Sequence, residues 1–121
     1  MNDYEETFEM SNLDINKQIL RCIKKQQLQE GWKILKRHGL NKDEAVMHNH
    51  KEGLYYTYDY TRDISLSWPL ILENKIDLRF DLDEEGTCTA GSPVGLCCYD
   101  KNPLRAAMLV FLMMKEQENE I

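Results

Sequence analysis

The longest unbroken apolar run in this chain covers residues 106–114, close to its C-terminal end. Asn102 is a good N-cap and Pro103 suits the first helical position, so the sequence predicts a helix that continues through Lys115. The middle of this helix is apolar on nearly every side, and such a helix must be covered on more than one face. The cover has to come from a sheet, from another helix, or from a second copy of the protein.

Two sets of apolar side chains on this helix point in different directions, so one sheet face is not enough to cover them all. The sets are Leu104, Met108, Phe111 and Leu112 on one side, and Leu109, Val110, Met113 and Met114 on others. The remaining cover comes either from the first helix of the chain or from an identical helix of a second protomer. We favour the second case, which gives a two-fold homodimer with a methionine-rich seam.

Two stretches in the first third of the chain show helical spacing. Residues 11–23 begin with Ser11 and Asp14, a variant of the capping box, and their apolar residues recur on one helical face. Residues 27–38 predict a second helix that closes at Gly39.

The middle of the chain predicts a hairpin followed by a helix. Residues 45–50 and 54–60 are rich in aromatic and β-branched residues and flank a glycine-containing turn, which is typical of a β-hairpin. Residues 63–74 return to helical spacing, and Pro69 is tolerable there if it lies in the first turn.

A second hairpin is expected from residues 76–82 and 87–90, and residues 96–99 predict one more short strand. The first of these strands alternates, and four apolar residues should point inward: Ile76, Leu78, Phe80 and Leu82. Helices and hairpins in one short chain predict an α+β fold.

The length of 121 residues fits one domain. We expect a loose N-terminal tail over residues 1–10, a single α+β domain over residues 11–115, and a polar C-terminal tail over residues 116–121.

Charge and composition limit the classes of function. The formal net charge of -6 at pH 7 argues against broad attraction to nucleic acid or to anionic membrane lipid. Residues 1–10 are acidic and lack the basic start of a signal peptide, and no apolar run approaches the roughly 20 residues that cross a bilayer. The four cysteines have no regular spacing and are interpreted as reduced thiols. We therefore expect a soluble protein of the bacterial cytosol.

No stretch carries a complete catalytic, metal or nucleotide motif. His48 and His50 share a face of a predicted strand, but no CxxC or HxxxH spacing accompanies them, so a zinc site is disfavoured. The acidic residues 81–85 fit a solvated hairpin turn better than a calcium loop. Residues 91–95 match neither a P-loop nor a dinucleotide fingerprint. We expect no catalytic residue, no metal and no cofactor, and hence a binding protein rather than an enzyme.

Residues 55–68 are the main candidate for a binding surface, because they combine several tyrosines with an arginine and a tryptophan. The ordinary alternative is that tyrosines fill a small sheet, and it accounts for part of the cluster. Tyr58, Arg62 and Trp68 are left as candidate binding residues. Arg105 is the fourth candidate, since it is a charged residue in an apolar helix and either snorkels to solvent or pairs with a carboxylate or an anionic ligand.

Three segments resemble the NinX family of small phage proteins, which come from the nin region of lambdoid phages. They are LDINKQ at residues 13–18, WPLILENKI at 68–76 and, the most specific, NPLRAAMLVFLMM at 102–114. Residues 26–50 look like material that the typical family member lacks. The order of elements is also similar to phage ABA-sandwich domains. That similarity implies an antiparallel sheet covered by helices on both faces, an α/β/α sandwich.

The resemblance implies a phage context and no particular activity. Small phage accessory proteins without catalytic motifs often act against host defences, and this analogy predicts a non-enzymatic counter-defence or host-takeover factor that binds and inhibits a host protein in the host bacterial cytosol. The alternative is an oligomeric sponge that sequesters a small anionic signalling nucleotide between protomers. Its candidate anion partners are Arg62, Arg79, Lys101 and Arg105.

Overall fold

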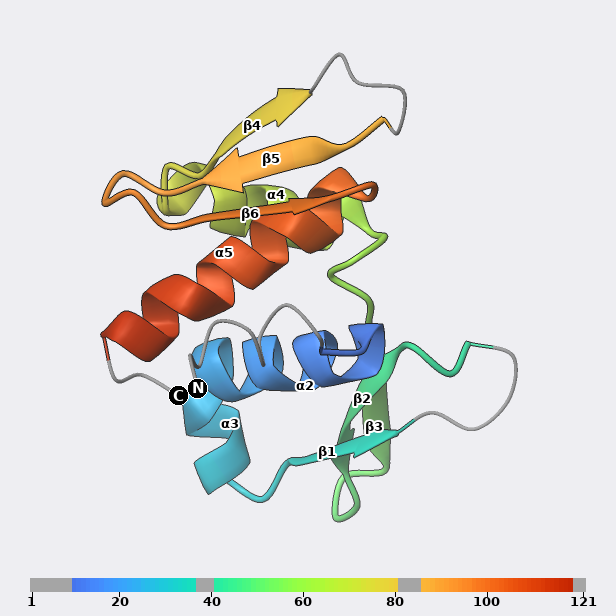
Figure 1. Cartoon of the computed structure of the whole chain (residues 1–121). Coiled ribbons are helices and arrows are strands. Elements are labelled where there is room, and N and C mark those ends of the chain that lie inside the picture. The colour runs from blue at the N-terminus through green and yellow to red at the C-terminus, as the bar shows by residue number, and fades with distance from the viewer. Residues whose placement is uncertain (1–9, 37–40, 81–85, 119–121) are drawn as a thin grey trace.

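Helix α5 (Pro103–Gln117) crosses the middle of the molecule, and the other elements are arranged around it (Figure 1). The computed structural model describes residues 10–36, 41–80 and 86–118. Before α5 the chain forms, in order, α2 (Asn12–Ile23), α3 (Lys25–Gln29), β1 (Lys33–Lys36), β2 (Ala45–Asn49), β3 (Leu54–Tyr58), α4 (Ile64–Glu73), β4 (Asp77–Phe80), β5 (Cys88–Gly91) and β6 (Cys97–Asp100).

The predicted C-terminal helix is confirmed, including its start. The Asn102 side chain accepts hydrogen bonds from the backbone N–H groups of Leu104 and Arg105, at 3.0 and 3.3 Å. Every residue from 106 to 113 is buried, because β5 and β6 pack on one side of α5 while α2 and α4 pack on others. The cover therefore comes from the same chain. Of the two sources of cover that the sequence left open, helix α2 packs beside α5, and Met113 is buried within the protomer. The homodimer itself stays a prediction.

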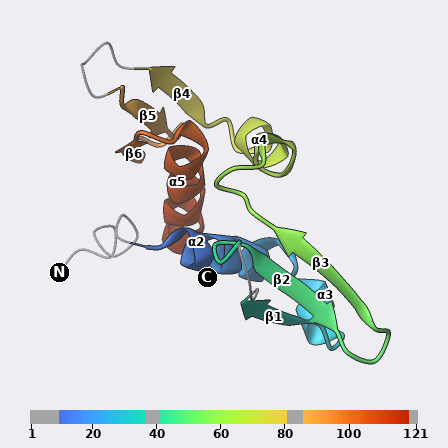
Figure 2. The ribbon, with the colours of Figure 1, turned by 90° about the vertical axis from the view of Figure 1, so that its right-hand side faces the viewer.

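The strands form two three-stranded antiparallel sheets rather than one. Sheet 1 has the order β1-β2-β3, and sheet 2 has the order β4-β5-β6. The α+β class is confirmed, but the single sheet with helices on both faces is wrong. Figures 1 and 2 show the reason: sheet 2 lies against α5, and α2 lies between α5 and sheet 1, so the two helices hold the sheets apart.

Both predicted hairpins are confirmed, with Ala45 opposite Tyr58 in the first and Leu78 opposite Ala90 in the second. The second-helix prediction over residues 27–38 is wrong. Helix α3 ends at Gln29, Gly31 takes a φ of 100°, and the chain then forms β1 along β2. A left-handed φ breaks a helix, and pairing with a neighbouring strand overrides a weak local helix preference.

For the strand over residues 76–82, the prediction that alternate apolar side chains point inward is confirmed only in part. Ile76 is buried and Leu78 is half-buried, but Phe80 is exposed. Helix α5 packs mainly on β5 and β6, so the end of the edge strand β4 receives little cover. Leu82 lies outside the described residues.

The helix predicted over residues 63–74 is confirmed as α4, but Pro69 lies inside the helix, beyond its first turn. The predicted tails are described only in part. Residues 1–9 and 119–121 lie outside the described residues, and residues 116 and 117, expected in the C-terminal tail, continue α5. Within the described parts of the chain, no helix has the length and apolar character needed to span a membrane.

Candidate binding surface around helix 4

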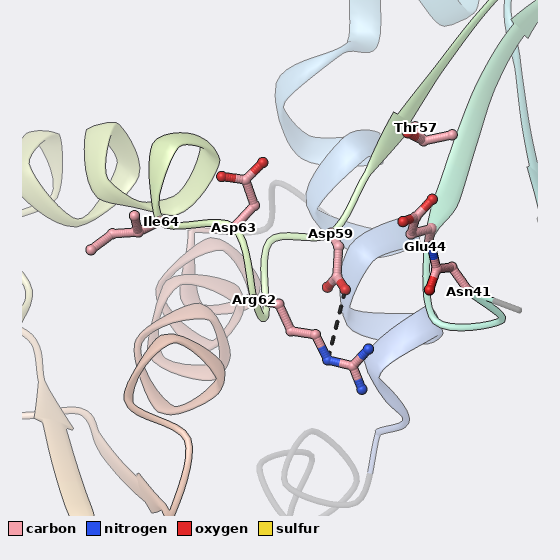
Figure 3. A pocket seen from close by; sticks show the side chains of 7 residues that line it. All are labelled: Asn41, Glu44, Thr57, Asp59, Arg62, Asp63 and Ile64. Carbon is pink, nitrogen blue, oxygen red and sulfur yellow. Dashed lines mark ion pairs between the residues drawn. The ribbon is translucent and has the colours of Figure 1, made fainter.

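A hollow of about 470 Å³ lies where the chain leaves β3 and enters α4, next to the loop that leads into β2. Figure 3 shows its lining from both sides, with Asp63 and Ile64 at the start of α4 and Glu44 and Asn41 across from them. The lining consists of Asn41, Glu44, Thr57, Asp59, Arg62, Asp63 and Ile64. The lining contains three carboxylates and one guanidinium, so we call it the acidic hollow.

Two of these carboxylates are held in place by hydrogen bonds. Asp59 Oδ1 accepts from the Thr61 hydroxyl at 2.6 Å, from the Thr61 N–H at 3.2 Å and from Nδ2 of Asn16 at 3.1 Å. Asn16 is fully buried in α2 and also accepts the Tyr60 N–H at 2.6 Å. Asp63 is the N-cap of α4, where its Oδ1 accepts from the Ser65 N–H at 3.0 Å. Both carboxylates are therefore preorganised.

Arg62 lies on the rim of the acidic hollow. Its Nη2 contacts Oδ2 of Asp43 at 2.9 Å, and its Nε lies 4.0 Å from Oδ2 of Asp59. The Arg62 side chain is 60% exposed, and exposed ion pairs of this kind contribute only about 0–1 kcal/mol to stability. The guanidinium thus offsets part of the negative charge but stays accessible to a partner.

Arg105 has a different role from the one that anion binding requires. Its Nε contacts Asp100 at 3.0 Å, while Nη1 and Nη2 donate to Asn12 Oδ1 and to the Met10 carbonyl, each at 2.6 Å. The side chain is 17% exposed. Of the alternatives left open by the sequence, pairing with a carboxylate is the correct one, and Arg105 ties the start of α2 to the start of α5.

Arg62 and Arg105 belong to one network of polar contacts. Asn12, which accepts from Arg105, places its Nδ2 3.5 Å from the same Asp43 carboxylate oxygen that contacts Arg62. Asn102 joins the set through a 2.7 Å hydrogen bond to the Thr61 carbonyl. These contacts connect the starts of α2 and α5 to the loop before α4. They thereby hold in place the loop that lines the acidic hollow.

Trp68 lies on the outer side of α4, in a row of three exposed apolar side chains. Ile64, Trp68 and Leu72 are 60%, 44% and 59% exposed, and their spacing of four residues places them on one helical face. We call this row the α4 stripe. A second hollow of about 350 Å³ is lined by Ile64, Ser65, Trp68 and Pro69, so Ile64 borders both hollows and joins the stripe to the acidic hollow.

Tyr58 points away from this surface. Thr57 lines the acidic hollow, and neighbouring residues of a strand face opposite sides, so Tyr58 faces the core. Its ring stacks on that of Tyr60 with centroids 6.0 Å apart, and Lys24 Nζ lies 5.7 Å from its centroid. Burial raises the pKa of Tyr58 and raises that of Tyr60 further. Here the ordinary interpretation, a tyrosine filling a small sheet, is the better one.

The other candidate residues lie outside the two hollows. The rings of His48 and His50 lie 5.9 Å apart, but no group of three or more His, Cys, Asp or Glu side chains suited to a metal occurs within the described ranges. Burial raises the pKa of the Cys98 thiol to about 12, which keeps it protonated. Arg79 and Lys101 line neither hollow.

Sequence reasoning placed Arg62 and Trp68 in this region but missed the carboxylates and two members of the α4 stripe. The helical spacing of residues 63–74 predicts a helix but does not single out Ile64 and Leu72, because spacing alone does not say which face of a helix is covered. Acidic residues on both sides of Arg62 were a visible signal, whereas Asp43 and Glu44 join them only after folding.

Comparisons with known proteins returned no match among family models, curated proteins or solved structures. The resemblance to the NinX family therefore stays a prediction.

Proposed function

We propose that this protein is a non-enzymatic phage accessory factor that binds and inhibits a host protein, with the α4 stripe as its contact surface. The observation that carries the proposal is the exposure of Ile64, Trp68 and Leu72 in one row on a well-formed helix. The phage context and the counter-defence or host-takeover role rest on the resemblance of three sequence segments to phage proteins.

The composition of the stripe supports a role in protein binding. Tryptophan is among the residues that most often dominate the energy of an interface, and aliphatic neighbours exclude water around it. Exposed apolar side chains that form a continuous row are a feature of interaction sites rather than of ordinary surface.

The rigidity of α4 also supports docking. Another face of the helix is anchored by the buried residues Ser67, Leu70 and Ile71, and the helix is capped by Asp63 at its start. At its other end Asn74 Nδ2 donates to the Leu70 carbonyl at 2.8 Å. A surface that is already ordered loses little conformational entropy on binding.

The alternative, a sponge for a signalling nucleotide, has weaker support. A phosphate in the larger hollow would meet Glu44, Asp59 and Asp63, and the smaller hollow is apolar. Arg105 already has protein acceptors around it. Arg62 is the one cation of the larger hollow among the residues described, and carboxylates contact it.

Affinity capture from bacterial lysates tests the proposal. Wild-type protein should retain a stoichiometric host protein, and Trp68→Ala should weaken that complex by about 30-fold or more, as expected of a hot-spot residue. Tyr99→Ala is the matched control, because Tyr99 is an exposed aromatic residue on sheet 2, away from α4. The proposal is wrong if no stoichiometric partner appears in several hosts, or if both variants capture it equally well.

A further inference from the structure

The acidic hollow lies at one end of the α4 stripe. Asp63 and Ile64, the first residues of α4 and its cap, border the hollow, and the stripe then continues along the helix to Leu72. At 1.5 Å per residue, the stripe spans about 12 Å. The docking surface is therefore asymmetric, with carboxylates near the start of α4, where Figure 3 shows Asp63 beside Ile64, and exposed apolar side chains farther along the helix.

The carboxylates at that end of the stripe are held in position before any partner binds. Buried Asn16 and the Thr61 hydroxyl position the Asp59 carboxylate, and the Ser65 N–H positions that of Asp63. Glu44 lines the hollow from the opposite side. Arg62 offsets only part of this charge, since it already contacts Asp43 and Asp59.

We propose that the partner segment that binds this surface is a basic amphipathic helix of the host protein. This inference rests on the proposed function and specifies the chemistry of its partner. Apolar side chains of the segment pack on the α4 stripe, because rows of residues spaced by four on one helix fit the grooves of another helix. Lysine or arginine side chains at one end of the segment reach the acidic hollow.

Charge complementarity is the reason to choose this partner. Basic side chains gain from preorganised carboxylates, and unlike charges across an interface raise both the association rate and the specificity. Nucleic acid and anionic membranes present phosphates, which the carboxylates repel. Helix α4 itself has no lysine or arginine, so a second copy that paired through this helix alone would leave the carboxylates unmatched.

The test uses a fluorescein-labelled synthetic helix with leucines spaced i, i+4, i+7 and i+11 and lysines in its first turn. The control peptide has glutamate at every lysine position. In fluorescence anisotropy, the lysine peptide should bind the full-length protein at least about 10-fold more tightly than the glutamate peptide. Its affinity should fall between about 0.05 and 0.5 M sodium chloride, because salt screens exposed charges.

Matched variants locate the contact. Glu44→Lys should weaken binding of the lysine peptide by about 10-fold or more, whereas Glu52→Lys should change it by less than about twofold. Both variants change the net charge equally, but Glu52 lies in the turn at the far end of the β2–β3 hairpin. Trp68→Ala and Leu72→Ser should each remove most of the binding. Circular dichroism and thermal melting check that every variant is folded, and Leu72→Ser keeps the test valid if Trp68→Ala does not fold.

The outcomes separate this inference from the proposed function. Equal binding of the two peptides, or equal effects of Glu44→Lys and Glu52→Lys, overturns the basic-helix inference alone if Trp68→Ala still abolishes host-protein capture. Both proposals are overturned if the lysine peptide does not bind and if, in addition, host-protein capture is absent or does not depend on Trp68. A wild-type dimer that Trp68→Ala converts to a monomer in sedimentation experiments identifies a second copy as the occupant and also overturns the inference.

Discussion

Helices α5 and α4 are both apolar, but the protein uses them in opposite ways. In α5 all residues from 106 to 113 are buried. In α4 only Ser67, Leu70 and Ile71 are buried, whereas the α4 stripe is exposed. Figure 2 shows the cause: sheet 2, α2 and α4 surround α5, while α4 lies at the edge of the molecule. Burial thus depends on where a helix lies in the fold as well as on its composition.

This difference separates the residues that hold the fold together from those available for binding. Leu112 in α5 and Leu72 in α4 are 2% and 59% exposed, so the same substitution at each position measures the two roles directly.

The largest expected effect is that of Leu112→Ala. Removing a buried leucine side chain leaves a cavity and costs about 2–5 kcal/mol of unfolding free energy. Urea denaturation followed by circular dichroism measures the change. A loss below about 1 kcal/mol would mean that α5 is not the centre of the core.

A smaller effect is expected from pH, through a thiol buried beneath α5. Burial, and to a lesser extent Asp100, raises the pKa of Cys98 from 9.0 to about 12. The folded state therefore keeps a proton that the unfolded state releases above pH 9. The stability that this proton contributes is complete below pH 9 and is lost as the pH rises toward 12, by about 1.4 kcal/mol per pH unit.

The measurement is the unfolding free energy at several values between pH 8 and pH 10, in wild type and in Cys98→Ala. The variant should lose the part of the pH dependence that Cys98 contributes. Cys97→Ala is the control, because Cys97 is the exposed neighbour on β6. Equal slopes in wild type and Cys98→Ala would contradict the burial of this thiol under α5.

The smallest effect on stability is expected from Leu72→Ala. The exposed side chain contributes little to the core, and alanine is at least as good a helix former as leucine, so the unfolding free energy should change by no more than about 0.5 kcal/mol. Denaturation under the same conditions as for Leu112→Ala gives the comparison. A loss above about 1.5 kcal/mol would place Leu72 in the core and remove part of the proposed docking surface.

Local chemistry was sufficient to predict where several elements begin and turn. Ser11 and Asn102 cap their helices as the sequence predicts, since a cap depends on hydrogen bonds within one turn. The first hairpin turns next to Gly53, whose φ is 67°. These features follow from contacts between residues that are close in the chain.

Contacts between distant residues decided the rest. Strand β1 exists because β2 offers it a pairing edge, and the split into two sheets follows from the packing of α2 on α5. Arg62 and Arg105 have the same chemistry, but Arg105 is held among the starts of α2 and α5, while Arg62 remains exposed. The type of a residue carries no information about which distant groups bury it or pair with it. The tertiary structure alone therefore separates the core from the docking surface.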